Sequence, residues 1–264
     1  MSARSAAAPP PDGASPVRGW LPHPSLTDFP GRLAPVLFVS GCNFRCGFCH
    51  NAALLGAPQP GVSWGELDIF CRKMRREWAD GVVVSGGEPT LAPELETLLR
   101  RLRGYGWAVK LDTNGSRPDA LERALPLVDY VAMDIKCAPE DYPALTGFSD
   151  TDRIRDSIAL IKARAADYEF RTTVLETFHT ADDLAALRPW LAGARRYVLQ
   201  PFVPRAHLPD ETWSTAPRTS PARLRVLGEI FRDCVDELRL ETGAVPDLHY
   251  RRRAGSPAHL PRRE

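Results

Sequence analysis

Six apolar or β-branched runs, each followed by a stretch with helical spacing, constrain the fold of this chain more than any other feature. The runs cover residues 36–40, 81–85, 107–112, 130–134, 169–174 and 196–200. The helical stretches cover residues 64–78, 93–103, 118–125, 152–165, 181–191 and 221–240. Strands that alternate with helices in this way predict a parallel sheet with right-handed crossover connections.

Several of these runs are uniformly apolar, as strands buried on both faces of a parallel sheet should be. Six strand–helix units are too few for a closed eightfold barrel. An open, partial barrel and a doubly wound sheet are both compatible with the pattern. The placement of the polar motifs favours the first, so we predict an α/β fold, a partial (β/α)6 barrel with parallel strands.

Polar and glycine-rich motifs follow the carboxyl ends of consecutive predicted strands, where parallel α/β proteins build their sites. In chain order they are Cys42, Cys46 and Cys49, then Gly86-Gly87-Glu88-Pro89-Thr90, Asp112-Thr113-Asn114-Gly115, Asp134-Ile135-Lys136, Arg171, and Gln200-Pro201-Phe202. We expect these residues to meet at one edge of the sheet and to form the functional site.

The cysteine triplet supplies three thiolates from a single loop and leaves one corner of a metal centre open. A structural zinc site would need a fourth ligand and usually has two separated ligand pairs. His50 adjoins Cys49 and would strain the geometry as a fourth ligand. A [4Fe–4S] cluster with three irons held by Cys42, Cys46 and Cys49 accounts better for the open corner.

The other motifs each allow a structural and a functional interpretation. The glycines of Gly86-Gly87-Glu88-Pro89 suit a tight turn, or they bring backbone carbonyls and a carboxylate close to a ligand ammonium group. Asp112, Asp134 and Lys136 suit ordinary ion pairs at strand ends. Alternatively, Lys136 or Arg171 pairs with a ligand carboxylate, while the aspartates bind hydroxyls or a cation.

The composition and the two ends of the chain indicate what kind of protein this is and where its folded domain lies. The 34 basic and 33 acidic residues give no global field that favours nucleic acid or an anionic membrane, and no window is apolar enough to span a bilayer. Scattered cysteines favour the cytoplasm over a secreted disulfide scaffold. We expect a disordered tail over residues 1–16, a domain over 17–249, and a basic tail over 250–264 that is either solvated or a docking arm.

The Cys-x3-Cys-x-aromatic-Cys spacing, completed by Phe48, together with Gly-Gly-Glu-Pro after the second strand, resembles the radical S-adenosylmethionine (SAM) superfamily. Leu26-Thr27-Asp28-Phe29-Pro30-Gly31-Arg32 ahead of the first strand is similar to the activating enzymes of glycyl-radical enzymes. The run from Gly41 to Asn51 looks most like anaerobic ribonucleoside-triphosphate reductase activating proteins. The resemblance covers roughly residues 26 to 203.

The resemblance implies a cofactor set and a role for each matching residue. Cys42, Cys46 and Cys49 would hold one [4Fe–4S] cluster, whose open iron binds SAM. Phe48 would pack near the adenine, and Gly86, Gly87 and Glu88 would meet the methionine amino group, largely through backbone. The ribose, the carboxylate and a monovalent cation would be surrounded by Asp112, Asp134, Lys136 and Arg171.

The same resemblance implies a reaction and its partners. A flavodoxin- or ferredoxin-like donor would reduce the cluster, and SAM would be cleaved to methionine and a 5′-deoxyadenosyl radical. That radical would abstract hydrogen from a glycine of a glycyl-radical enzyme, in the first instance anaerobic ribonucleotide reductase. The cofactors carry this chemistry, and the protein supplies orientation.

The chain also departs from the pattern of these activating enzymes. Pro201-Phe202-Val203 stands where some of them have Pro-Tyr-His, so no imidazole contact is carried over from that position. A radical SAM enzyme for a small molecule or peptide is the alternative function, and a non-catalytic metal-binding or interaction module is a third. Cys71 and Cys234 lie on helical patterns that predict packing, and Cys137 lies close to the predicted site.

Overall fold

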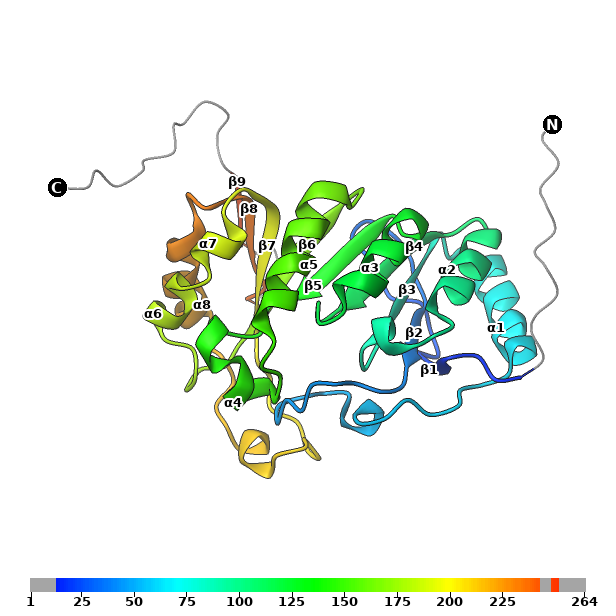
Figure 1. Ribbon diagram of the computed structural model, residues 1–264, viewed down its shortest axis with the longest axis horizontal. Helices are drawn as coiled ribbons and strands as arrows, with labels where there is room; N and C mark the ends of the chain where they lie inside the picture. Colours follow the sequence, from blue (N-terminus) through cyan, green and yellow to red (C-terminus); the bar gives the residue numbers. More distant parts are fainter. Residues whose placement is uncertain (1–12, 243–247, 252–264) are drawn as a thin grey trace.

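The chain is built around one curved sheet whose strands lie side by side in the order of the sequence. The computed structural model describes residues 13–242 and 248–251, and over this part the sheet has nine strands (Figure 1). β2 to β8 run parallel, and β1 and β9 pair antiparallel at the two edges. The strands are β1 (Val17–Trp20), β2 (Val36–Val39), β3 (Gly81–Gly86), β4 (Ala108–Thr113), β5 (Tyr130–Asp134), β6 (Tyr168–Val174), β7 (Ala194–Pro201), β8 (Val235–Leu240) and β9 (Leu248–Arg251).

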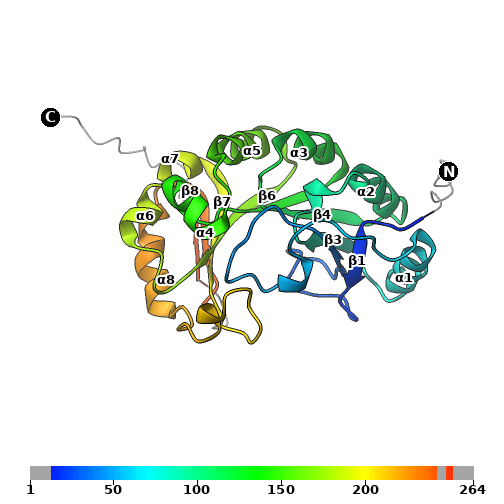
Figure 2. The ribbon, with the colours of Figure 1, turned by 60° about the horizontal axis from the view of Figure 1, so that its bottom comes forward.

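Most of the described α-helices cover the convex face of this sheet and leave the concave face to loops, which Figure 2 shows most clearly. They are α1 (Trp64–Arg76), α2 (Leu95–Gly104), α3 (Pro118–Ala124), α4 (Tyr142–Thr146), α5 (Thr151–Arg164), α6 (Ala181–Ala185), α7 (Arg188–Leu191) and α8 (Pro221–Gly228). The predicted α/β fold with an open, mostly parallel barrel is therefore confirmed. All six predicted strands are present as β2 to β7.

The sheet extends beyond the predicted six units because β8 adds a seventh parallel strand. We expected one helix over 221–240, but α8 ends at Gly228, a 3₁₀ turn follows, and the chain then pairs with β7. A side chain at position 228 would approach Leu240 to 2.9 Å, so the helix end and the strand pack closely. Glu237 of β8 accepts from Arg196 of β7 at 3.1 Å, which fixes the strand pairing from the concave side.

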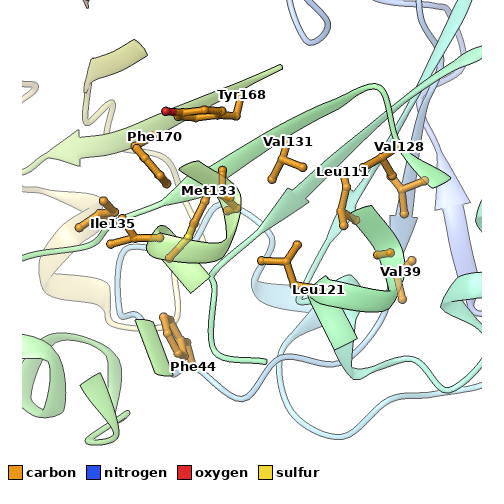
Figure 3. Close-up of a cluster of buried hydrophobic side chains, with 14 of the residues drawn as sticks. Val39, Phe44, Leu111, Leu121, Val128, Val131, Met133, Ile135, Tyr168 and Phe170 are labelled. Carbon is orange, nitrogen blue, oxygen red and sulfur yellow. The ribbon is translucent and has the colours of Figure 1, made fainter. Parts of the chain in front are cut away.

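The main hydrophobic core lies between the sheet and its helices. α1 begins with a capping box in which Ser63 and Glu66 satisfy each other's backbone N–H groups, and it buries its predicted apolar face. Figure 3 shows how side chains of neighbouring strands contribute to the same layer, with Leu111 from β4 and Val131 and Met133 from β5 near Leu121 of α3. A large continuous core of this kind holds the strand ends in fixed relative positions.

A second, smaller cluster fills the concave face near the amino ends of the strands. It contains Phe29, Ala34, Val36, Val83, Tyr130 and Ala132. Phe29 enters from the connection between β1 and β2 and is 3% exposed. Because successive residues of a strand face opposite sides, Val131 packs outward and Ala132 inward. The inner cluster closes one end of the barrel and leaves the carboxyl ends of the strands for the site.

The described ends of the chain belong to the folded domain. Of residues 13–16, which were expected in the tail, Ser15 and Pro16 are buried beside the sheet, and the Ser15 N–H donates to the Val62 carbonyl at 2.7 Å. β9 extends the sheet to residue 251. The remainder of both expected tails, 1–12 and 252–264, lies outside the described residues. In the described part, no helix is long and apolar enough to cross a membrane.

Candidate functional site

A cavity of about 610 Å³ opens at the carboxyl ends of the parallel strands, on the concave side of the sheet. All but one of the predicted site residues line it: Cys42, Cys46, Phe48, Cys49, Gly86, Gly87, Asp112, Asp134, Lys136 and Arg171. The exception is Glu88. Residues that lie up to 129 positions apart in the sequence therefore share one cavity, as the parallel topology predicts.

The cysteine loop leaves β2 and is fixed by backbone hydrogen bonds at several points. Cys42 donates its N–H to the Gly56 carbonyl at 2.9 Å, and Arg45 donates to the Thr146 carbonyl at 2.6 Å. Burial raises the pKa of the Cys42 thiol to about 12 and that of Cys46 to about 11, and it also raises the pKa of Cys49. These thiols ionise at neutral pH only if a nearby cation stabilises the thiolates, as a bound metal does.

The donor set fits an iron–sulfur cluster better than a single metal ion. All three thiols are free and face the same cavity. Among the described residues, no group of three or more His, Cys, Asp or Glu side chains meets the geometry for holding a metal ion. A cluster distributes its thiolates over several irons, so the three sulfurs need not converge on one point.

Gly86 and Gly87 allow the end of β3 to touch the start of the cysteine loop. A Cβ at Gly86, whose φ is +125°, would lie 2.2 Å from the Val39 carbonyl oxygen, and one at Gly87 would lie 2.1 Å from that of Gly41. The backbone instead pairs here, with the Gly87 N–H donating to Val39 and the Glu88 N–H to Gly41. The glycines therefore serve a close backbone approach and also line the cavity.

The prediction that the Glu88 carboxylate faces a ligand is wrong, because this side chain does not line the cavity. Its side chain is fully buried, and it accepts hydrogen bonds from the Thr90 N–H and hydroxyl, the Thr113 hydroxyl at 2.8 Å and the Asn114 N–H at 2.6 Å. Burial raises the pKa of Glu88, while these donors oppose the shift. The carboxylate joins the end of β3 to the end of β4, so only its backbone remains for the predicted cofactor contact.

Four charged side chains from β4, β5, β6 and the loop after β5 form a network at the cavity wall. The Asp134 carboxylate lies 2.8 Å from Lys136 Nζ and 2.8 Å from Arg171 Nε, and Arg171 also approaches Asp112 at 3.6 Å. The ion pairs expected at the strand ends are therefore present, and the same four residues line the cavity.

The pKa values of this network follow from its pairing. Burial favours the neutral acids, yet Arg171 with Lys136 holds the pKa of Asp134 well below its usual range, and Arg171 with Lys110 lowers that of Asp112. Burial also opposes the charge on Lys136, but Asp134 keeps the pKa of that ammonium raised. Both signs of charge are thus held in place before any ligand arrives.

Sequence reasoning missed several contacts around this cavity. Lys110, which is 2% exposed and lies 2.8 Å from Asp112, could have been found because it stands two residues earlier on the same strand face. His50 contacts the Val203 carbonyl through Nε2 at 2.9 Å and stacks on Phe202. Trp213 lies edge-on to Phe48. These last contacts depend on the long connection after β7, and no local signal predicts them.

The scattered cysteines are buried in the core and outside the cavity. Cys71 is packed in α1, Cys234 precedes β8, and Cys137 follows Lys136. None of the three lines the cavity. The packing expected for Cys71 and Cys234 is present, and Cys137 is close in sequence to the site without facing it.

Comparison with known proteins connects this site to one large superfamily. Residues 36–187, more than half of the chain, match the family described as the radical SAM superfamily. A protein from Methanocaldococcus jannaschii, whose name assigns it provisionally to the glycyl-radical enzyme activating enzymes, is 29% identical over 83% of this chain and 92% of its own length. A 7-carboxy-7-deazaguanine synthase from Halobacterium salinarum is 33% identical over 62% of this chain and 65% of its own length.

The solved structures support the fold. A structure of TYW1 with a lysine-pyruvate adduct bound aligns with a TM-score of 0.58 and 14% identity, over 79% of this chain and 76% of that one. At this identity the likeness shows the fold alone.

Proposed function

This chain belongs to the radical SAM superfamily, and we propose that it activates a glycyl-radical enzyme by abstracting hydrogen from a glycine of that partner. Membership of the superfamily implies a [4Fe–4S] cluster and SAM. When bound, these cofactors supply one-electron cleavage of a carbon–sulfur bond and hydrogen abstraction. The protein contributes binding, orientation and electrostatics.

The described residues fit the parts of this cofactor pair. Cys42, Cys46 and Cys49 would bind the cluster as thiolates, and the open corner beside Gly86 and Gly87 would receive SAM. Gly86 and Gly87 line the cavity, so their backbone would face the methionine moiety.

The paired charges and one aromatic ring would orient the rest of SAM. Lys136 and Arg171 would bind its carboxylate, and Asp112 and Asp134 would bind ribose hydroxyls or a monovalent cation. Phe48, which is 6% exposed and packs against Phe202 and Trp213, would flank the adenine. Because the charges are preorganised, little ordering would be needed on binding.

The similarity to the M. jannaschii protein is the main support for assigning this chain as an activase, that is, an activating enzyme of a glycyl-radical enzyme. It extends over most of both chains rather than over the cysteine motif alone. The cavity wall also includes Asp28 from the β1–β2 connection and Arg205 and Glu241 from the opposite edge, and we propose that a chain segment of the partner enters between them. We further propose that the partner is an anaerobic ribonucleotide reductase, that a flavodoxin- or ferredoxin-like protein donates the electron, and that both meet this chain in the cytoplasm.

Electron paramagnetic resonance (EPR) of a candidate partner tests the assignment. The reconstituted protein, SAM and a reductant are incubated anaerobically with a glycyl-radical enzyme from the same organism. We expect a glycyl-radical signal that depends on SAM and is absent with the Cys46→Ala variant. Cleavage of SAM without a radical on any such enzyme of the organism would contradict the activase assignment.

A second candidate is a radical SAM enzyme that acts on a small molecule, which the similarity to 7-carboxy-7-deazaguanine synthase favours. The polar wall residues Ser85, Thr173 and Gln200 could bind such a substrate. Formation of 7-carboxy-7-deazaguanine in extracts supplemented with the protein, and not with Cys46→Ala, would support this candidate over the first.

A further inference from the structure

We infer that Asn114 is a positioning residue that donates a hydrogen bond to the Cys42 sulfur and thereby raises the reduction potential of the cluster. The inference rests on the proposed assignment of Cys42 as a cluster ligand. Asn114 follows β4 and is 6% exposed. Its Nδ2 lies 3.8 Å from Cys42 Sγ and 3.1 Å from Asn43 Oδ1.

The orientation of the Asn114 amide follows from its other contact. The Ser116 N–H donates to Asn114 Oδ1 at 2.9 Å, so this oxygen is occupied as an acceptor. An amide turned over would place its NH₂ group against that N–H and its oxygen against Asn43 Oδ1 and the sulfur. Donor would then face donor and acceptor would face acceptor. The local contacts therefore direct the NH₂ group toward Cys42.

The backbone of Asn114 is held by the buried Glu88 carboxylate. Glu88 Oε2 accepts the Asn114 N–H at 2.6 Å, and its other oxygen accepts the Thr113 hydroxyl at 2.8 Å. Charge-assisted hydrogen bonds in a buried site are strong and fix geometry. This explains what a fully buried carboxylate does beside the cavity, because it places the Asn114 side chain against the cysteine loop.

The hydrogen bond distinguishes Cys42 from the other two cysteines. Cys42 Sγ accepts from the Phe44 N–H at 3.4 Å as well as from Asn114. Among the described residues, the structure records no side-chain donor to the sulfur of Cys46 or Cys49. Hydrogen bonds to ligand sulfurs stabilise the more negative, reduced state of a cluster and so raise its potential. Loss of the Asn114 amide should therefore make the cluster harder to reduce.

A redox titration of the reconstituted holoprotein, followed by EPR in the absence of SAM, tests this inference. Asn114→Leu keeps the approximate volume and adds no charge but removes the N–H donor, and Asn114→Ala removes the whole amide. Both variants should show a more negative midpoint potential than wild type at unchanged iron and sulfide content. Ser116→Ala is the matched control, because it removes the 3.2 Å contact to Asn43 and leaves the sulfur donor in place. Its potential should equal that of wild type.

Each other outcome has a defined meaning. A wild-type potential in both Asn114 variants at full cluster content would overturn the inference. Loss of the cluster from both, with the fold retained by circular dichroism and with Ser116→Ala intact, would show a structural role only and would also overturn it. A wild-type chain that takes up no cluster would instead contradict the proposed function itself.

Discussion

At the scale of single residues, location rather than burial separates the cavity cysteines from the others. Cys46 is 6% exposed and Cys71 is 0% exposed, and burial raises the pKa of both thiols. Only the first lines the cavity, next to paired charges of both signs. A thiol with a raised pKa is a poor nucleophile, so a metal-bound role fits Cys46 better than a covalent one.

Replacement of Cys46 tests the ligand assignment. We expect Cys46→Ala to lose the cluster, seen as loss of the visible absorbance and of bound iron after reconstitution, while circular dichroism stays close to wild type. Cys71→Ala removes an equally buried thiol from α1 and should keep the full cluster at a modest loss of stability, about 1–2 kcal/mol. A full, SAM-responsive cluster in Cys46→Ala would contradict the assignment.

Substitution of a cavity glycine by alanine should cause a strong steric clash, although alanine has the smallest side chain. In Gly87→Ala the new Cβ would meet the Gly41 carbonyl at 2.1 Å, so we expect a loss of about 1–3 kcal/mol in the free energy of unfolding, or misfolding of the cysteine loop. Gly65→Ala, in the first turn of α1, meets nothing closer than 3.9 Å and should be neutral or stabilising by up to about 1 kcal/mol. Urea unfolding measures both, and equal effects would refute the close-approach argument.

At the scale of elements, the connection after β7 packs over the cysteine loop. We call its contacting segment, which includes Asp210 and Trp213, the clasp. The Asp210 N–H donates to the Gly47 carbonyl at 3.1 Å, and Trp213 packs edge-on against Phe48 and Phe202. Edge-to-face pairs of this kind add about 0.5–1.5 kcal/mol beyond their buried area. The clasp thus holds Phe48 in place from outside the barrel.

Truncation of the clasp should loosen the site without unfolding the barrel. We expect Trp213→Ala to lower the free energy of unfolding by about 1–3 kcal/mol and to weaken SAM binding, measured by titrating the SAM-induced change in the cluster EPR spectrum. Trp78→Ala, at an 85% exposed tryptophan after α1, is the matched control and should change both by little. Unchanged SAM affinity in Trp213→Ala would argue against a clasp that supports Phe48.

The elements predictable from the sequence are those with strong local patterns. β2 to β7 and the apolar faces of α1 and α2 follow from apolar runs and helical periodicity. Glu237 and Arg239 resemble an exposed helix face, so the sequence pattern predicts helix over β8. In the structure Glu237 instead pairs with Arg196 of β7 across the strands and with Arg239 two residues further along β8. Tertiary pairing overrides local propensity there.

Some features of the site could likewise be predicted from the sequence, and others could not. Strand-end motifs predicted which residues share the cavity, because parallel topology brings strand ends together. The direction of the Glu88 side chain and the contact of Asn114 with Cys42 depend on how three loops meet. No local sequence pattern predicts how these loops pack, so the Glu88 direction and the Asn114–Cys42 contact could be seen only in the structure.

At the scale of the whole molecule, buried ion pairs on the concave face make stability depend on acid pH. Burial opposes ionisation of Glu237, but Arg239 and Arg196 lower its pKa from 4.5 to about 2. A depressed folded pKa contributes stability that is present above the unfolded value of 4.5 and is lost as pH falls toward 2. The lowered pKa values of Asp112 and Asp134 act in the same direction.

The free energy of unfolding of Glu237→Gln should therefore depend less on acid pH than that of the wild type. We expect the variant to be less stable than wild type at pH 7, because Arg196 and Arg239 lose a charged partner, and the difference to shrink between about pH 4.5 and 2. Glu229→Gln, in an exposed pair with Arg232, should follow the wild-type curve closely. Thermal unfolding across this pH range measures the effect, and a constant difference at all pH values would contradict the ion-pair explanation.

The most direct test of the central claim is cleavage of SAM by the isolated protein. The chain is reconstituted anaerobically with iron and sulfide, reduced with dithionite in the presence of SAM, and assayed for 5′-deoxyadenosine and methionine. We expect both products from the wild type and neither from Cys46→Ala. A wild-type protein that binds a complete cluster and SAM, is reduced by dithionite, and still forms no 5′-deoxyadenosine would contradict the account.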